Sequence, residues 1–407
     1  MEKQALVLGA GIQGVLVAIQ LARKGYDVKL IDKSSKAVSR ASGVNEGKIH
    51  LGLIWANDKS FETASYMLES AMVFTPIIES LVGENAPWEE WISAPFDYVC
   101  MHDSMLDKNE LQQFYDRLEN LYQKSYYGQL KYLNTNPECL IRQRPNIPKF
   151  LRNDKIQSVW ETSELSIDIT KFNSWLLSKL MEFENIQLCL GENVEEVIKT
   201  SYGYQVNCSS GGLKKKHEGD IVVNCTWESR LSIDKQLGFE PKHGWLYRLK
   251  HSVLADLPND LIDIPSLTFV LGPYGDVVNF GKSRKAYLSW YPDGMNDSST
   301  NISVPIGWEN ICDGVVYDIP GNEKLIERML IGLNEFIPGI CHSIESEISA
   351  GIIYSRGVTE ITDRNSELHK RFDVGIQIEK DGYFSIDTGK YTCAPLHACV
   401  GHHQNAI

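Results

Sequence analysis

The chain has 407 residues, of which 43% are hydrophobic and 23% are charged, and its formal net charge is −13. A chain of this length can bury a large core, so we expect two intertwined domains. The acidic balance argues against a nucleic-acid-binding surface, because neutralising phosphates needs clustered lysine and arginine. The nine cysteines form no C-x-x-C pair, which predicts reduced thiols and no metal site. No stretch has the length and apolarity of a spanning helix, so we expect a cytoplasmic protein without a transmembrane segment.

The first motif is a glycine-rich turn between a strand and a helix. An apolar run, Ala5 to Leu8, precedes Gly9, Gly11 and Gly14, and an apolar helical stretch follows from Val15 to Leu21. In this G-x-G-x-x-G spacing, Gly9 allows the tight turn, Gly11 lets the backbone approach a pyrophosphate, and Gly14 lets helix and strand pack closely. The N–H groups at the start of the helix then face the pyrophosphate.

A second strand completes the dinucleotide-binding unit. The strand Asp27 to Ile31 ends at Asp32, 18 residues beyond Gly14. At this position a carboxylate accepts hydrogen bonds from an adenosine ribose. The order of strand, turn, helix, strand and acid therefore predicts an α/β fold of the Rossmann type.

The segment after Asp32 differs from that of a nicotinamide dehydrogenase. It is a long loop of small and polar residues, Ser39 to Gly52, which lets backbone amides approach a flat polar ligand. The loop resembles that of the D-amino acid oxidase and glycine oxidase superfamily of FAD enzymes. Its Lys48–Leu53 piece also resembles an element of glycerol-3-phosphate dehydrogenases and L-2-hydroxyglutarate oxidases.

Further matches extend this resemblance over most of the chain. The resemblance implies that Val194 lies over the adenine and that Thr226, at the end of a strand returning to the sheet, lies beside the cofactor. The stretch Ala350–Gly357 resembles the Gly-x-Arg-Pro element of the family, without its proline. Asp387–Leu396 resembles its last glycine turn, which leads into a short helix that points at the pyrimidine edge of the flavin. Motif and resemblance together imply these cofactor-binding residues: Gly9, Gly11, Ile12, Gln13, Gly14, Asp32, Lys33, Ser42, Gly43, Asn45, Gly47, Lys48, Ile49, Val194, Thr226, Gly389, Lys390, Tyr391 and Thr392.

The same resemblance implies two domains. A discontinuous Rossmann-like FAD-binding domain comprises residues 1–80, 151–230 and 340–407, and a mainly antiparallel substrate domain comprises residues 81–150 and 231–339. Apolar periodicity predicts helices over Phe61–Val82, Asn109–Lys124, Thr170–Phe183 and Asn322–Phe336. Alternation predicts strands over Asn193–Ile198, Gly203–Cys208, Trp245–Leu249 and Ala286–Tyr291.

The implied function is that of an FAD-dependent oxidoreductase. It would transfer a hydride to flavin from a C–N bond next to a carboxylate in a small molecule, and pass the electrons to oxygen or another acceptor. Three alternatives stay open at this point. They are a 2-hydroxy acid or polyol-phosphate dehydrogenase, an enzyme acting on a larger biosynthetic intermediate, and a flavin-binding subunit without turnover.

Arg356 is the first candidate to bind the substrate carboxylate, because arginine holds a carboxylate through two hydrogen bonds. An ion pair with Asp363 or Glu360 is the alternative for this arginine, in which case Lys48 or Arg284 takes its role. Tyr354, two residues away, is expected to line the same site.

His50 is the second catalytic candidate, and it could orient the flavin, act as a base or attach FAD covalently. Alternation along the strands predicts that one or two of five aromatic residues line the pocket: Tyr247, Tyr274, Tyr287, Trp290 and Tyr291.

Overall fold

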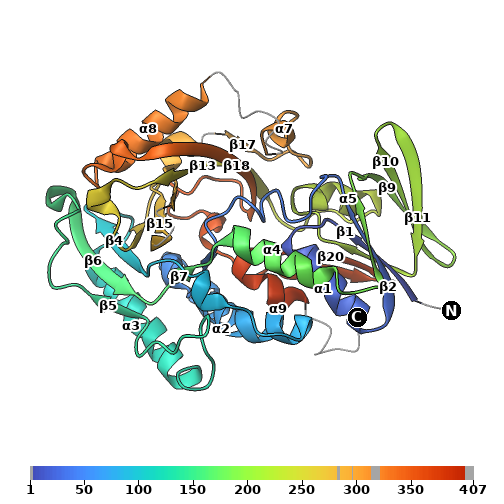
Figure 1. Ribbon diagram of the computed structural model, residues 1–407, viewed down its shortest axis with the longest axis horizontal. Coiled ribbons are helices and arrows are strands. Elements are labelled where there is room, and N and C mark those ends of the chain that lie inside the picture. The colour runs from blue at the N-terminus through green and yellow to red at the C-terminus, as the bar shows by residue number, and fades with distance from the viewer. Residues whose placement is uncertain (1–2, 282–284, 296, 313–320, 399–407) are drawn as a thin grey trace.

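Two sheets organise the computed structural model, which describes residues 3–281, 285–295, 297–312 and 321–398. Figure 1 shows a six-stranded sheet on the right of the molecule and a nine-stranded sheet on the left and top. Helices α1, α2, α4 and α9 lie together in the lower centre of the view. No helix in the described part of the chain is long and apolar enough to cross a membrane.

The six-stranded sheet contains the predicted dinucleotide-binding unit. Its order is β19-β20-β12-β1-β2-β8, with every pair parallel except β19–β20. The strands are β1 (Lys3–Leu8), β2 (Tyr26–Asp32), β8 (Ile186–Leu190), β12 (Ile221–Asn224), β19 (Gly375–Lys380) and β20 (Tyr383–Asp387). The sheet therefore combines strands from the two ends and the middle of the chain.

Helix α1 (Ile12–Arg23) is buried along almost its whole length. It lies between the six-stranded sheet and the helices α2 (Glu62–Val82), α4 (Ile169–Leu180) and α9 (Ala394–Ala398). This position explains why its sequence is apolar on all sides rather than on one face. It begins earlier than the predicted Val15, directly after the second glycine of the motif.

A three-stranded antiparallel sheet adjoins β1. It comprises β9 (Asn193–Thr200), β10 (Gly203–Ser210) and β11 (Leu213–Gly219). Its first two strands confirm the pair predicted from sequence. A separate two-stranded ladder joins β3 (Lys48–Ile49) to β7 (Leu165–Ser166).

The nine-stranded sheet is antiparallel except for the β14–β4 pair. It contains β4 (Phe96–Met101), β5 (Ile141–Gln143), β6 (Ile156–Thr162), β13 (Trp245–Asp256), β14 (Ser266–Val270), β15 (Asp276–Asn279), β16 (Lys285–Leu288), β17 (Asp297–Ser299) and β18 (Ile344–Arg356). The predicted ranges assigned β6 and β18 to the FAD-binding domain. Both strands instead bond into this sheet, and β18 pairs with β13 over almost its full length.

The remaining helices lie around this frame. They are α3 (Lys108–Ser125), α5 (Arg230–Gln236), α6 (Tyr291–Gly294), α7 (Trp308–Cys312) and α8 (Asn322–Asn334). Helix α3 begins where Asp107 accepts hydrogen bonds from the N–H groups of Asn109 and Glu110, and the Glu110 side chain accepts one from the Asp107 N–H. Apart from end shifts of a few residues, α2, α3, α4 and α8 match the predicted helices.

Candidate active site

A large pocket opens between the two sheets. One wall is made by the loops that follow β1, β2, β12 and β20, and the other by β13, β14 and β15. Ligands of open α/β sheets bind at these carboxyl ends. The pocket therefore lies where the dinucleotide motif directs a cofactor.

The three motif glycines have different steric roles. Gly9 has φ of +92°, and a Cβ there would lie 2.7 Å from the carbonyl oxygen of Cys225. A Cβ at Gly14 would overlap the carbonyl oxygen of Gly9, so this residue packs the helix on the turn and does not line the pocket. A Cβ at Gly11 would meet only the Ser42 hydroxyl, at 3.0 Å, and Gly11 does line the pocket. The space beside Gly11 is therefore free for a ligand.

Asp32 lies at the end of β2 and lines the pocket. Its Oδ2 accepts a hydrogen bond from the Ala10 N–H at 2.6 Å, and its Oδ1 accepts one from the Ser34 N–H at 2.7 Å. These bonds fix the carboxylate and leave further lone pairs for a ribose hydroxyl.

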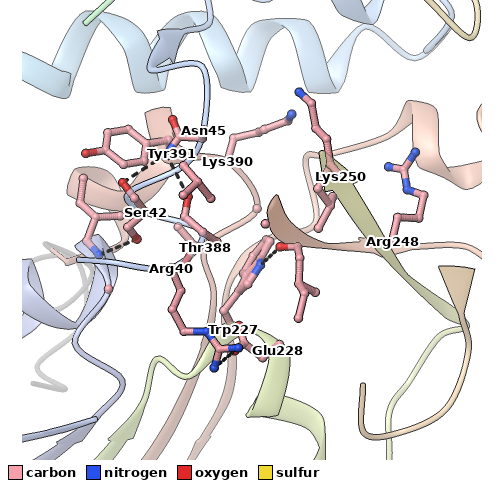
Figure 2. Close-up of a pocket in the computed structure, with 18 of the residues that line it drawn as sticks. Arg40, Ser42, Asn45, Trp227, Glu228, Arg248, Lys250, Thr388, Lys390 and Tyr391 are labelled. Carbon is pink, nitrogen blue, oxygen red and sulfur yellow. Dashed lines mark hydrogen bonds and ion pairs between the residues drawn. The ribbon is translucent and has the colours of Figure 1, made fainter. Parts of the chain in front are cut away.

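The loop after β2 is folded onto the start of α1. Ser42 Oγ accepts a hydrogen bond from the Ile12 N–H at 3.0 Å, and the Ser42 carbonyl accepts one from the Asn173 side chain at 3.0 Å. Asn45 donates to the Ala41 carbonyl and accepts from the Gly47 N–H at 2.8 Å. Ser42 and Asn45 consequently face the pocket from a rigid loop (Figure 2).

Several predicted cofactor residues lie behind this wall instead of lining it. A Cβ at Gly43 would lie 2.6 Å from the Ser39 carbonyl oxygen, and one at Gly47 would overlap the Ile167 carbonyl, so both glycines serve the turn of the loop. Ile49 is fully buried, and Thr392 accepts a hydrogen bond from the His50 N–H at 3.0 Å. The other predicted cofactor residues line the pocket: Gly9, Gly11, Ile12, Gln13, Asp32, Lys33, Ser42, Asn45, Lys48, Val194, Thr226, Gly389, Lys390 and Tyr391.

Four cations of the pocket are neutralised by an acid. Lys33 Nζ lies 2.6 Å from Glu309, Arg40 Nη1 2.9 Å from Glu228, Lys48 Nζ 2.7 Å from Asp276 and Lys250 Nζ 3.2 Å from Glu46. The Arg40–Glu228 pair is drawn in Figure 2. These ion pairs fix the pocket wall and leave little free charge at those positions.

Arg248 is different, because its buried guanidinium forms no ion pair within the described residues, although the more distant charge of Glu360 acts on it. The residue is only 5% exposed, and its Nε and Nη1 have no hydrogen-bond partner within the described residues. Burial lowers its pKa from the usual arginine range. Figure 2 shows Arg248 and Lys250 across the pocket from Ser42 and Tyr391. An unpaired buried guanidinium in a pocket is a ready partner for an anionic ligand group.

Two further cations line the pocket. Burial, followed by the positive charge of Arg248, lowers the pKa of Arg371 to about 10. Burial lowers the pKa of Lys390 to about 8, with contributions from the charges of Arg371, Lys250 and Arg248, while Glu46 acts in the opposite direction. The charged forms of both side chains are therefore unfavourable, and an anion bound in the pocket would stabilise them.

His50 faces the same space with a free nitrogen. Its Nδ1 has no hydrogen-bond partner within the described residues and lies 4.0 Å from Glu164 Oε1. Burial, then the positive charges of Lys390 and Lys48, lowers its pKa well below the usual histidine range, so the ring is neutral at neutral pH. Glu164 is fully buried and accepts hydrogen bonds from the Tyr98 hydroxyl and the Leu51 N–H.

The prediction that Arg356 lines the active site is not met. Its Nη1 donates to Asp373 at 2.6 Å, its Nε lies 3.7 Å from Glu367, and it does not line the pocket. The alternative of an ion pair describes its position better, although with partners other than the predicted Asp363 and Glu360. Tyr354 is also outside the pocket, with its ring 5.0 Å from the Arg230 guanidinium.

The sequence interpretation missed Arg248 and Arg371. Arg248 carried a signal, since it interrupts the apolar Trp245–Leu249 strand at a position that the structure buries. Arg371 stands in a polar loop and carried none. Of the five aromatic candidates, three line the pocket (Tyr274, Tyr287 and Tyr291). Arg284 lies outside the described residues.

One group of potential metal ligands occurs in the part of the chain that the structure describes. Cys189, Glu192 and His217 present ligand atoms within 4.8 Å of one another. Both Glu192 oxygens already accept hydrogen bonds, from Lys215 Nζ at 2.6 Å and from His217 Nε2 at 2.7 Å. We therefore assign no ion to this group.

Comparison with known proteins agrees with this geometry. The family model of the DAO FAD-dependent oxidoreductases matches residues 4–370. The chain belongs to this family. It is therefore an FAD-dependent oxidoreductase, and the free space at Gly11 and the fixed Asp32 carboxylate fit that cofactor. No curated protein matches the sequence at a significant level.

Solved structures of related fold cover nearly the whole chain. Glycine oxidase from Geobacillus kaustophilus is 12% identical, with a TM-score of 0.63 and coverage of 97% of this chain and 93% of its own. L-proline dehydrogenase from P. horikoshii is 14% identical, with a TM-score of 0.63 and coverage of 98% and 91%. L-α-glycerophosphate oxidase from Mycoplasma pneumoniae, solved with FAD bound, is 14% identical, with a TM-score of 0.62 and coverage of 98% and 93%. At these identities the likeness shows the shared fold.

Proposed function

We propose that this oxidoreductase oxidises the C–N bond of a small amine whose reacting carbon carries a carboxylate. The observation that carries the proposal is the buried guanidinium of Arg248, which lines the pocket and forms no ion pair with an acid in the described part of the chain. A bidentate contact with a carboxylate would satisfy its free Nε and Nη1 atoms and would fix the α-carbon of the substrate.

The pocket residues divide between cofactor and substrate. The Gly9–Gly11 turn and the start of α1 would hold the pyrophosphate of FAD, Asp32 the adenosine ribose and Val194 the adenine. Ser42, Asn45 and the Gly389–Tyr391 turn would hold the flavin. Bound FAD supplies an acceptor for the two electrons of the substrate.

His50 is suited to hold a proton during this reaction. An amino acid enters as an ammonium form, which must lose a proton before it can give up a hydride. Burial and neighbouring cations lower the pKa of His50, so its ring is neutral and has one nitrogen without a proton, which would accept that proton. The rings of Tyr287 and Tyr291 line the same chamber and would exclude water from it.

The His50–Glu164 arrangement also favours a second candidate, oxidation of a 2-hydroxy acid. A hydroxyl group must lose its proton as the hydride leaves, so this chemistry needs a base beside the reacting carbon. Glu164 Oε1, at 4.0 Å from His50 Nδ1, would stabilise the imidazolium that results. An amine oxidase depends less on such a base, because a neutral amine can lose hydride directly.

Anaerobic reduction of the flavin separates the two candidates. Purified holoenzyme is mixed without oxygen with amino acids, N-methyl amino acids and 2-hydroxy acids of matched chain length, and bleaching of the flavin absorption is followed. The proposal expects bleaching by an amino or N-methyl amino acid. Bleaching by hydroxy acids alone would establish the second candidate, and no bleaching by either class would overturn both. Peroxide formed on re-aeration identifies oxygen as the acceptor.

A further inference from the structure

Two buried guanidinium groups share one end of the pocket. Arg248 is 5% exposed and Arg371 is 7% exposed, and both line the pocket. They come from unconnected segments, Arg248 from β13 and Arg371 from the loop before β19. The fold therefore brings two positive charges together in a place that water reaches poorly.

Neither guanidinium has an acid as its partner within the described residues. Nε and Nη1 of Arg248 have no hydrogen-bond partner, and Nη1 of Arg371 makes only a long bond, 3.4 Å, to the Tyr354 carbonyl. Asp387 is the acid whose charge raises the pKa of Arg371, but it also lies 3.7 Å from Arg230 Nη2 and pairs with that arginine. Lys48 and Lys250, which also line the pocket, each have an acid of their own.

Without a bound anion, the two charged guanidinium groups of Arg248 and Arg371 are electrostatically unfavourable. Burial disfavours each charged form, and the charge of Arg248 lowers the pKa of Arg371 further, to about 10. Arginine remains protonated in spite of such shifts, so the site retains two positive charges at neutral pH. His369, which lines the pocket beside them, cannot balance this charge and has its own pKa lowered by burial.

We propose that the substrate is doubly anionic at this end: besides the carboxylate held by Arg248, it carries a second acidic group held by Arg371. A single carboxylate neutralises one guanidinium and leaves the other buried and unpaired. A second carboxylate or a phosphate supplies the missing negative charge, so that each guanidinium has an acceptor for two hydrogen bonds. The inference rests on the proposed function, since it assigns the same pocket end to the substrate.

Binding of unreactive anions to the holoenzyme tests the proposal without turnover. Succinate and butyrate have the same chain length and differ in the second carboxylate, and inorganic phosphate represents the other source of a double charge. Dissociation constants are measured by calorimetry or by flavin spectral change at constant ionic strength, so that screening is equal. We expect succinate or phosphate to bind at least about tenfold more tightly than butyrate.

Two variants assign the effect to Arg371. Arg371→Gln should remove most of the preference for the dianion while butyrate affinity changes little, and Arg371→Lys should keep part of it as a single charge. Arg356→Gln is the matched control, because that arginine pairs with Asp373 outside the pocket, and it should keep the full preference. If the glutamine variant does not fold, the comparison of succinate, phosphate and butyrate on the unaltered holoenzyme decides alone.

Equal binding of succinate, phosphate and butyrate to the unaltered holoenzyme would overturn the inference, as would a preference that survives in Arg371→Gln. That outcome is separate from failure of the proposed function. Amines can bleach the flavin without a dianion preference, which removes only the inference. A dianion preference without bleaching by any amine or hydroxy acid supports the inference and removes the proposed reaction.

Discussion

At the scale of single residues, burial decides which side chains of the pocket can bind a ligand. Lys48 and Lys250 are buried but paired with Asp276 and Glu46, so their charge is already used within the protein. Arg248 is equally buried, and its Nε and Nη1 have no hydrogen-bond partner among the residues that the structure describes. The pocket therefore contains cations of two kinds: some are paired with acids of the pocket wall, and others are able to bind an anionic ligand.

Lys390 leads to a prediction about pH. Because its pKa is lowered to about 8, its ammonium form is present below this pH and is lost as the pH rises through it. Affinity for an unreactive carboxylate should therefore fall across about pH 8, and the bound anion should raise the pKa of this lysine. Titrating the holoenzyme with butyrate at several pH values measures the effect. Lys390→Met should flatten the profile around pH 8, and an unchanged profile in this variant would assign the titration to another group.

The predicted residues Gly9, Gly11 and Asp32 line the pocket because the chain itself fixes their geometry. Gly9, Gly11 and Asp32 lie within one strand–turn–helix–strand unit, so their spacing determines where they meet. Arg356 failed because its position depends on a sheet register. It pairs with Trp245 at the end of β18, whereas Arg248 pairs with Ile353 further along the same ladder and enters the pocket.

At the scale of elements, the turn between β1 and α1 should respond differently to two similar substitutions. Gly14→Ala forces a Cβ into the carbonyl oxygen of Gly9, so we expect the apoprotein to lose roughly 1–3 kcal/mol of unfolding free energy, or more. The Cβ that Gly11→Ala introduces meets only the Ser42 hydroxyl, at 3.0 Å. The unfolding free energy of the apoprotein should therefore stay close to that of wild type, while the affinity for FAD falls.

Denaturant unfolding of the apoproteins and FAD titration measure these two effects separately. The assignment of Gly11 to the cofactor would be wrong if Gly11→Ala bound FAD as tightly as wild type. The packing role of Gly14 would be wrong if Gly14→Ala unfolded at the wild-type denaturant concentration.

Sequence periodicity identified most elements but could not assign all of their partners. The four predicted helices are present, and the β9–β10 pair was expected. Strands β6 and β18 pair within the nine-stranded sheet, although the resemblance placed their residues in the ranges of the FAD-binding domain. Neither a resemblance nor the alternation of side chains specifies the neighbours of a strand. Pairing between strands that are distant in the sequence is determined by the tertiary fold and not by the local pattern of residues.

At the scale of the whole molecule, the pocket forms because two sheets from interleaved segments face one another. The six-stranded sheet contributes the cofactor loops, and β13 of the nine-stranded sheet contributes Arg248 and Lys250. The resemblance predicted this arrangement of a dinucleotide-binding sheet beside a mainly antiparallel sheet. Tyr287 of this sheet was among the predicted aromatic residues, whereas the entry of Arg248 into the pocket depends on strand pairing that the sequence pattern does not specify.

The most direct test of this account compares two arginine variants by anaerobic titration of the flavin with the amine that reduces it best. Replacing Arg248 by methionine removes an unpaired buried charge, so the protein should fold and keep its flavin spectrum. We predict that Arg248→Met weakens substrate binding by about 2–4 kcal/mol, roughly 30–1,000-fold, while Arg356→Met changes it by about twofold at most. Substrate affinity that is unchanged in Arg248→Met, or lost in Arg356→Met, would contradict it.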